Sequence, residues 1–204
     1  MKFTPVVIFF LLLTVFKSRV FAQTRSPLSE FSTQWNEPLY KDCNTASNES
    51  YLTANEKEVI YILNLARAYP RLFCKSVVES EAFRENNNYY TSLVATMQAM
   101  QPLTILQPNR KCFASADCHA ITSGRVGYAG HDRQSANCRK LFYMMGECCS
   151  YGEDTPLGIV MQLLVDDGVQ SLGHRKICLG DYNSIGVSIQ PHKQYGTNAV
   201  LDFY

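Results

Sequence analysis

Two histidines and several carboxylates stand beside glycines in four short stretches of the chain. The stretches are Gly130-His131-Asp132, Gly146-Glu147-Cys148, Val165-Asp166-Asp167-Gly168-Val169 and Gly173-His174-Arg175. Neutral imidazole and carboxylate are both good ligands for Zn²⁺-type ions, and the same groups can carry out acid/base work. We expect all four stretches on loops or at helix ends. Each is a weak signal alone, since none has the spacing of a short metal motif such as H-E-x-x-H.

The chain has eight cysteines, which favours an oxidising compartment. Eight cysteines allow 105 pairings, so their number does not give the connectivity. No C-x-x-C spacing occurs, which argues against a zinc ribbon or a thioredoxin-type centre.

The first 22 residues have the pattern of a secretory signal peptide. Lys2 precedes an apolar run from Val6 to Phe16, and Ala22 provides a small residue for cleavage before Gln23. The run is too short to span a bilayer of about 30 Å. An uncleaved N-terminal anchor is the alternative. We therefore expect a secreted, periplasmic or otherwise extracytoplasmic protein, with no integral membrane span after cleavage.

Length and composition indicate one soluble domain. The chain has 204 residues, of which 46% are hydrophobic, and this excludes a wholly disordered chain. Loss of the signal peptide removes three of 19 basic and none of 18 acidic side chains, so the formal charge becomes −2. Near-neutral charge gives no electrostatic reason to expect a nucleic-acid partner. We divide the chain into residues 1–22, an extended lead-in over 23–52, and a domain over 53–204 with one continuous core.

Hydrophobic periodicity predicts helices first and strands late, which is typical of an α+β domain. A capping box at Thr53 and Glu56 marks the first helix, and Thr155-Pro156 marks the last. The expected helices cover 53–69, 72–83, 89–100, 114–122 and 155–167, with a loop over 127–137. A β-hairpin is expected from strands 185–189 and 200–203, with a longer loop over 191–196.

Four polar residues receive structural interpretations. Asn64 and Arg67, one helical turn apart, are expected to make structural hydrogen bonds. We expect His119 to be structural or on the surface, and His192 to face solvent from the hairpin loop.

The order of these motifs resembles the CAP superfamily (cysteine-rich secretory, antigen 5 and pathogenesis-related 1 proteins; SCP domain). Gly-His, Gly-Glu, a Thr-Pro-started helix, Gly-His-Arg, a Gly-Val strand and a closing Val-x-Asp-Phe follow one another over residues 53–204. The segment Asn64-Leu65-Ala66-Arg67 is similar to the first-helix Asn-x-x-Arg of the family. Asp-Asp-Gly-Val and the terminal Pro-His-x-x-Tyr-Gly resemble the microbial or plant-like subgroup.

The resemblance implies a three-layer α/β/α sandwich with a central, mostly antiparallel sheet and a large cleft. Two histidines and two acids line that cleft in the family, and some members bind zinc or another divalent ion there. The matching positions are His131, His174 and Glu147. Asp166 and Asp167 are both candidates for the second acid, and either is one methylene shorter than the usual Glu.

Three cysteines depart from the family pattern. Cys148 and Cys149 follow Gly-Glu, where Asn is usual, and Cys178 follows Gly-His-Arg-Lys-Ile. A disulfide from Cys178 to Cys148 or Cys149 is the first hypothesis, because it would join the two halves of the cleft. The alternatives are packed thiols, or pairing of one neighbour with Cys138.

The resemblance favours a secreted, non-catalytic module whose cleft binds a divalent metal, a sterol or lipid, or a protein surface. The second hypothesis is a metal-dependent, peptidase-like hydrolase, in which His131 and His174 hold the ion and Glu147 activates water. No nucleophile or oxyanion donor is identifiable for it. A third is a disulfide-hardened extracellular protein with a vestigial site.

Overall fold

A four-stranded mixed sheet lies at the centre of the computed structural model, which describes residues 25–204. The predicted signal peptide, residues 1–22, and its cleavage site lie outside the described residues. The strand order is β1-β3-β4-β2, with β1–β3 parallel and the other two pairings antiparallel. The strands are β1 (Gln107–Pro108), β2 (Gly146–Tyr151), β3 (Ser184–His192) and β4 (Gly196–Phe203). The expected mixture of helices and strands is confirmed.

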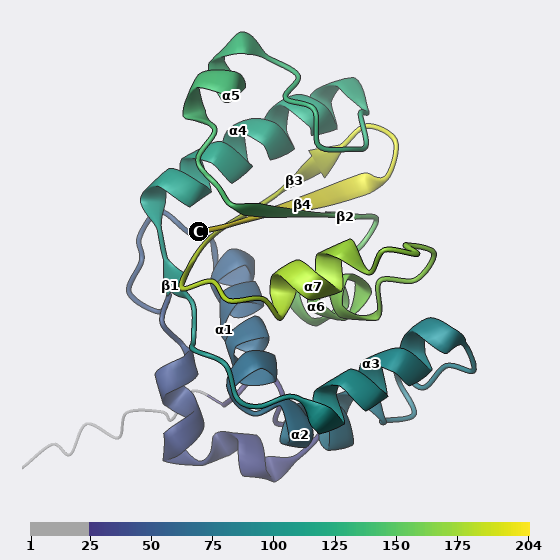
Figure 1. Ribbon diagram of the computed structural model, residues 1–204. Helices are drawn as coiled ribbons and strands as arrows, with labels where there is room; N and C mark the ends of the chain where they lie inside the picture. The colour runs from purple at the N-terminus through teal and green to yellow at the C-terminus, as the bar shows by residue number, and fades with distance from the viewer. Residues whose placement is uncertain (1–24) are drawn as a thin grey trace, which may run out of the picture.

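Helices cover both faces of this sheet (Figure 1). On one face, α4 (Arg110–Val126) crosses β3 and β4, and α5 (Ala136–Leu141) packs on α4. On the other face lie α1 (Ala54–Ala68), α6 (Pro156–Val165) and α7 (Gly173–Cys178). Gly186 allows α4 its close approach, because a Cβ there would clash with the backbone at Cys112 and Phe113. Helices on both faces of the sheet thus surround the candidate functional site.

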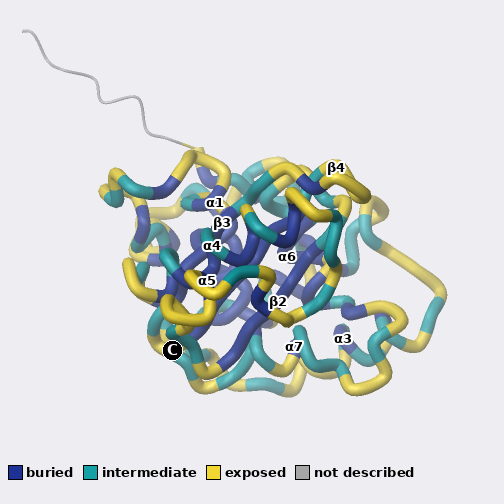
Figure 2. Tube along the Cα trace, turned by 90° about the horizontal axis from the view of Figure 1, so that it is seen from above, coloured by how far each residue is buried: buried dark blue, intermediate teal, exposed yellow. Residues whose placement is uncertain are grey.

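The core consists of two clusters instead of the single continuous one expected. Buried residues concentrate in the centre of the molecule, along the strands and α1 (Figure 2). The larger cluster joins the sheet to α1 and α6, and a smaller one lies beneath α4, formed by Ala116, Ala120, Cys149 and Val200. The sheet separates the two clusters, since alternate side chains of a strand point to opposite faces.

Residues 25–52 are part of the fold, which corrects the expectation of an extended lead-in. They contain the short 3₁₀ helices η1 (Thr33–Asn36) and η2 (Pro38–Cys43). Leu28, Trp35 and Tyr40 are buried in the larger cluster. The Trp35 indole N–H also donates to Ser76 Oγ at 3.0 Å. The folded unit thus begins well before Thr53. The segment is mostly polar, so its few buried apolar residues were not recognised in the sequence.

The local signals for helix starts are confirmed. Thr53 and Glu56 form the expected capping box of α1, and Thr155 caps α6. The chain then continues after Pro70 through α2 (Pro70–Phe73) and the π-turn η3 (Cys74–Val78) to α3 (Asn88–Ala99). Helix α4 is longer than predicted, and α5 occupies part of the predicted 127–137 loop. The hairpin forms with longer strands and a shorter connection.

Asn64 and Arg67 have the structural role expected of them. Asn64 donates to the carbonyls of Cys43 and Leu106, and its own oxygen accepts from the Leu106 N–H. The buried Arg67 guanidinium donates to four carbonyls, those of Thr104, Cys178, Gly180 and Tyr182. Arg67 therefore fixes the segment that follows α7. Within residues 25–204, no helix combines the length and the apolarity that a membrane crossing requires.

Candidate functional site: two histidine–carboxylate pairs

His131 is held by Glu147 at the edge of the sheet. Its Nδ1 lies 2.8 Å from Glu147 Oε1. Glu147 is in strand β2, not on a loop or helix end as predicted, and its side chain is 2% exposed while that of His131 is 57% exposed. The hydrogen bond to Glu147 raises the pKa of His131 against the opposing effect of burial. A carboxylate only accepts hydrogen bonds, so Nδ1 carries the proton and Nε2 of the neutral ring keeps its lone pair.

His174 is held in the same way by Asp166, which resolves the choice between the two neighbouring acids. Asp166 Oδ1 lies 2.7 Å from His174 Nδ1, and Oδ2 accepts from the backbone N–H groups of His174 and Arg175. Asp167 is exposed. Asp166 ends α6 in the left-handed conformation, with φ of 56°, which turns its short side chain toward the start of α7. The aspartate therefore reaches the imidazole despite its missing methylene.

The two pairs converge. The ring centres of His131 and His174 are 6.2 Å apart, although the residues come from a loop after α4 and from α7. Within the part of the chain that the structure describes, no hydrogen bond engages Nε2 of either ring. The structure brings together His131, Glu147 and His174, the positions that match the family motifs, and it places Asp166 beside His174. The sequence left open both the choice between Asp166 and Asp167 and which imidazole each carboxylate holds.

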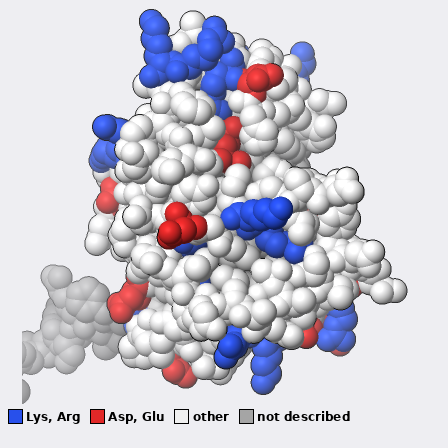
Figure 3. All heavy atoms as spheres, viewed as in Figure 1, with Lys and Arg blue, Asp and Glu red and all other residues white. Residues whose placement is uncertain are grey.

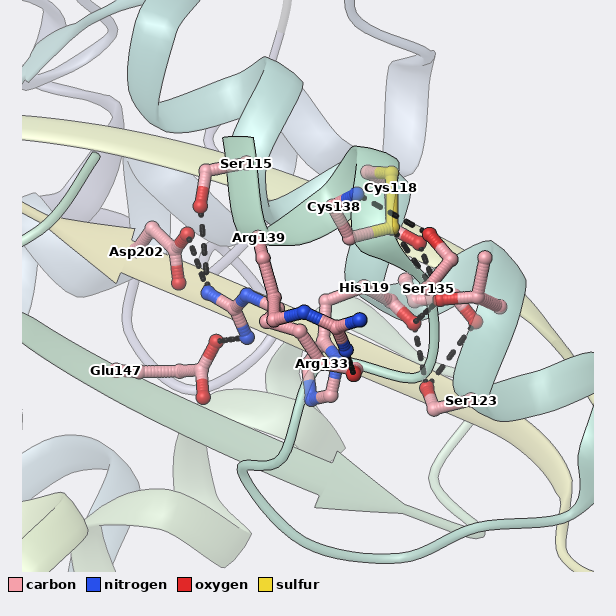
Figure 4. Close-up of a disulfide and its surroundings, with 12 residues drawn as sticks. Ser115, Cys118, His119, Ser123, Arg133, Ser135, Cys138, Arg139, Glu147 and Asp202 are labelled. Carbon is pink, nitrogen blue, oxygen red and sulfur yellow. Dashed lines mark hydrogen bonds and ion pairs between the residues drawn. A yellow bond between two sulfur atoms is a disulfide. The ribbon is translucent and has the colours of Figure 1, made fainter. Parts of the chain in front are cut away.

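Behind His131, one arginine lies between two buried acids, as Figure 4 shows. The Arg133 guanidinium donates to Glu147 Oε2 and lies 3.4 Å from Asp202 Oδ2. Asp202 faces Glu147 across β4 and β2. Burial raises the pKa of Glu147, but the bonds from His131 and Arg133 outweigh it and hold that pKa below its ordinary value. Burial and the Glu147 charge raise the pKa of Asp202 to about 8. At neutral pH the cluster thus holds Glu147 charged and Asp202 largely neutral.

A cavity of about 420 Å³ opens beside His174. Its wall is largely apolar and includes Phe83, Met161 and Val165, and Cys149 and Asp166 also reach it. The cavity has the size of a small-ligand site, and it adjoins one of the two histidine–carboxylate pairs.

Charges of both signs are mixed over the face of the molecule in Figure 3, and Lys and Arg gather at the end that carries α5.

The cysteines differ from the disulfide hypothesis. Cys138 bonds to Cys118 and so joins α5 to α4, while the other six cysteines are free and buried. Cys148 and Cys178 lie together, as the first hypothesis required, but their sulfurs are 3.8 Å apart and unbonded. Cys149 points to the other face of β2. The pairing of Cys138 with Cys118 was not foreseen, because the number of cysteines leaves their connectivity open.

Comparisons with protein-family models, with curated proteins and with solved structures found no match to this chain. The geometry of the site and the order of its motifs are therefore the two indications of function.

Sequence reasoning missed three residues beside the site, namely Arg133, Asp202 and His119. His119 is fully buried on α4, and with Glu147 and Cys149 it forms a group that could hold a metal ion. A strand prediction over 146–151 would have placed Glu147 and Cys149 on one face, two residues apart. His192, expected to face solvent, is buried, and it bonds the Tyr128 carbonyl through Nε2.

Proposed function

We propose that this protein is a secreted, non-catalytic ligand-binding module whose cleft binds a divalent cation through Nε2 of His131 and His174. The observation that carries the proposal is the pairing of each imidazole, at Nδ1, with a buried carboxylate. Metal-binding histidines characteristically donate their second ring N–H to such a partner, which fixes both tautomer and orientation. Glu147 and Asp166 are then positioning residues.

The residues present fit such an ion. A tetrahedral ion bonded at about 2.1 Å to both Nε2 atoms holds the ring centres about 5 Å apart. The observed separation is 6.2 Å, which is within about 1.2 Å of that value, and the His131 ring is largely exposed. Imidazole ligands favour Zn²⁺ over Ca²⁺ or Mg²⁺. A cation bound there would supply a positive charge and an open coordination position.

Membership of the CAP superfamily is part of this proposal. Its support is the order of the motifs along the chain, together with helices on both faces of the sheet, which is the arrangement expected of a three-layer α/β/α sandwich. Secretion belongs to the same proposal, and it depends on the pattern of residues 1–22. The Cys118–Cys138 disulfide is consistent with an oxidising compartment.

The cavity argues for an organic ligand beside the ion. Its apolar wall fits a sterol or another lipid, but Glu85, Glu153 and Asp167 also line it, which disfavours an anionic headgroup. A neutral sterol is thus favoured over a fatty acid. Extraction of the native protein followed by mass spectrometry tests this part, and a co-purified fatty acid without any sterol would contradict it.

The geometry gives less support to the hydrolase hypothesis. Glu147 would have to accept a proton from water, yet its side chain is only 2% exposed. The lowered pKa of Glu147 makes it a weaker base still. We therefore favour binding over hydrolysis.

Titration calorimetry with zinc tests the proposed site. The wild-type protein should bind zinc, and His131→Ala and His174→Ala should each weaken binding by at least tenfold. His192→Ala is the control, since this buried histidine lies outside the cleft and bonds Tyr128. Unchanged zinc affinity in both cleft variants would exclude the site.

A further inference from the structure

We propose a second, buried zinc site formed by His119 Nδ1, Cys149 Sγ and a carboxylate oxygen of Glu147. It lies on the α4 side of the sheet, and it is distinct from the cleft pair because neither His174 nor Nε2 of His131 takes part. One ring nitrogen of His119, the Cys149 Sγ and one Glu147 carboxylate oxygen lie within 4.8 Å of one another, and all three residues are buried. Glu147 belongs to both sites, as a positioning residue in the first and a ligand in the second.

The orientation of His119 leaves a bare nitrogen in the interior. Its Nε2 lies 2.9 Å from the carbonyl oxygen of Gly130, and a carbonyl can only accept, so Nε2 carries the proton. Nδ1 therefore presents a lone pair, and it is a buried atom with no hydrogen-bond partner among the described residues. Burial lowers the pKa of His119, which keeps the ring neutral. A buried acceptor without a partner is destabilising, and a bound cation would remove that destabilisation.

Cys149 supplies a soft ligand at the same place. It follows Glu147 by two residues on β2, so both side chains point to the face beneath α4. Figure 4 shows His119 and Glu147 on this side of the sheet, with Arg133 between them. Burial raises the pKa of the Cys149 thiol well above its ordinary value. The metal-free site thus holds a thiol, which loses its proton to solvent when the ion binds.

The combination of ligands indicates zinc. Thiolate with imidazole selects Zn²⁺ over Ca²⁺ and Mg²⁺, which prefer oxygen ligands alone. Bonds of about 2.0–2.3 Å place the ligand atoms of a tetrahedral zinc about 3.5 Å apart, so the largest movement needed is about 1 Å.

Cobalt substitution tests the buried site separately from the cleft. Co²⁺ added to the purified wild-type protein should give the ultraviolet charge-transfer band of a cobalt–thiolate bond, and zinc should displace it. Cys149→Ser should abolish the band and weaken zinc binding at this site by at least the 10–100-fold that loss of a weaker, outer-shell partner costs. Cys148→Ser is the matched control, because this neighbouring buried cysteine points to the opposite face, and it should keep the band.

Two further variants test which residues the cobalt–thiolate band requires. His174→Ala removes the cleft site and should retain the cobalt–thiolate band, while His119→Gln should lose it. If Cys149→Ser does not fold, as judged by near-ultraviolet circular dichroism, the His119→Gln result decides. A wild-type protein without the band, or a band that persists in Cys149→Ser or in His119→Gln, overturns the buried site. A His174→Ala protein that keeps the band and binds one zinc ion fewer than the wild type would support both proposals.

Discussion

Replacement of Asp166 by asparagine should weaken metal binding in the cleft while preserving the fold. The Asp166 Oδ2 atom accepts from two backbone N–H groups at the start of α7, and the only oxygen of an asparagine must take that position. The amide NH₂ then faces His174 Nδ1, now 2.7 Å from Oδ1. Because NH₂ donates, Nδ1 must accept, and the ring proton moves to Nε2. The nitrogen proposed to bind the cation loses its lone pair.

The magnitude follows from the role of the carboxylate as an outer-shell partner. Loss of such a partner typically weakens metal binding by about 10–100-fold, or about 1.4–2.8 kcal/mol. Asparagine also tolerates the left-handed conformation at this position, where φ is 56°, so little backbone strain is added. The fold should therefore survive.

Zinc titration calorimetry near neutral pH is the assay, with urea unfolding as the check on stability. Asp167→Asn is the matched control, because it makes the same change of charge at the exposed neighbour. The control should bind zinc like the wild type. Equal zinc affinity in the two variants would refute the reasoning, since His174 would then not bind the ion through Nε2.

Three other predictions concern stability. Asp202 has a pKa of about 8 in the folded state and 3.8 ordinarily, so the folded protein holds a proton that the unfolded chain has lost between these values. The free energy of unfolding should therefore fall as pH rises from 4 to 8, by up to about 1.4 kcal/mol per pH unit. Urea unfolding of Asp202→Asn at the same pH values should not show this pH dependence. Arg67→Met leaves four carbonyls, including that of the buried Cys178, without their donor and should cost about 3 kcal/mol or more by urea unfolding; a loss under 1 kcal/mol would contradict its role. Oxidised glutathione should join Cys148 to Cys178 in a disulfide, taking up two electrons while both thiol protons leave. The number of free thiols found by titration should then fall by two, and the free energy of unfolding should rise by about 3 kcal/mol. Cys148→Ser should show neither change.

Local signals with a direct physical cause predicted much of the fold. The capping box at Thr53 and the Thr-Pro start of α6 depend only on neighbouring residues, and both helices begin where expected. Strand β2 was missed, because its residues Gly-Glu-Cys-Cys-Ser-Tyr show no alternation of polar and apolar types. Both faces of β2 are buried, so the usual pattern of a half-exposed strand is absent.

The same limit explains which details of the site could not be predicted from the sequence. The choice of Asp166 over Asp167 depends on a left-handed residue at the end of α6, which no spacing reveals. His119 was given a structural role because a lone helical histidine has no visible partner in sequence. Its neighbours Glu147 and Cys149 come from β2, which follows after a separate helix. The role of such a residue depends on contacts between segments that lie far apart in the sequence and that the sheet brings together.

Anomalous diffraction at the zinc edge, from crystals of this protein grown with zinc, tests the central claim most directly. The account predicts a peak about 2 Å from Nε2 of both His131 and His174, with Glu147 and Asp166 still bonded to the opposite ring nitrogens. Well-ordered histidine rings without a zinc peak between them would contradict it.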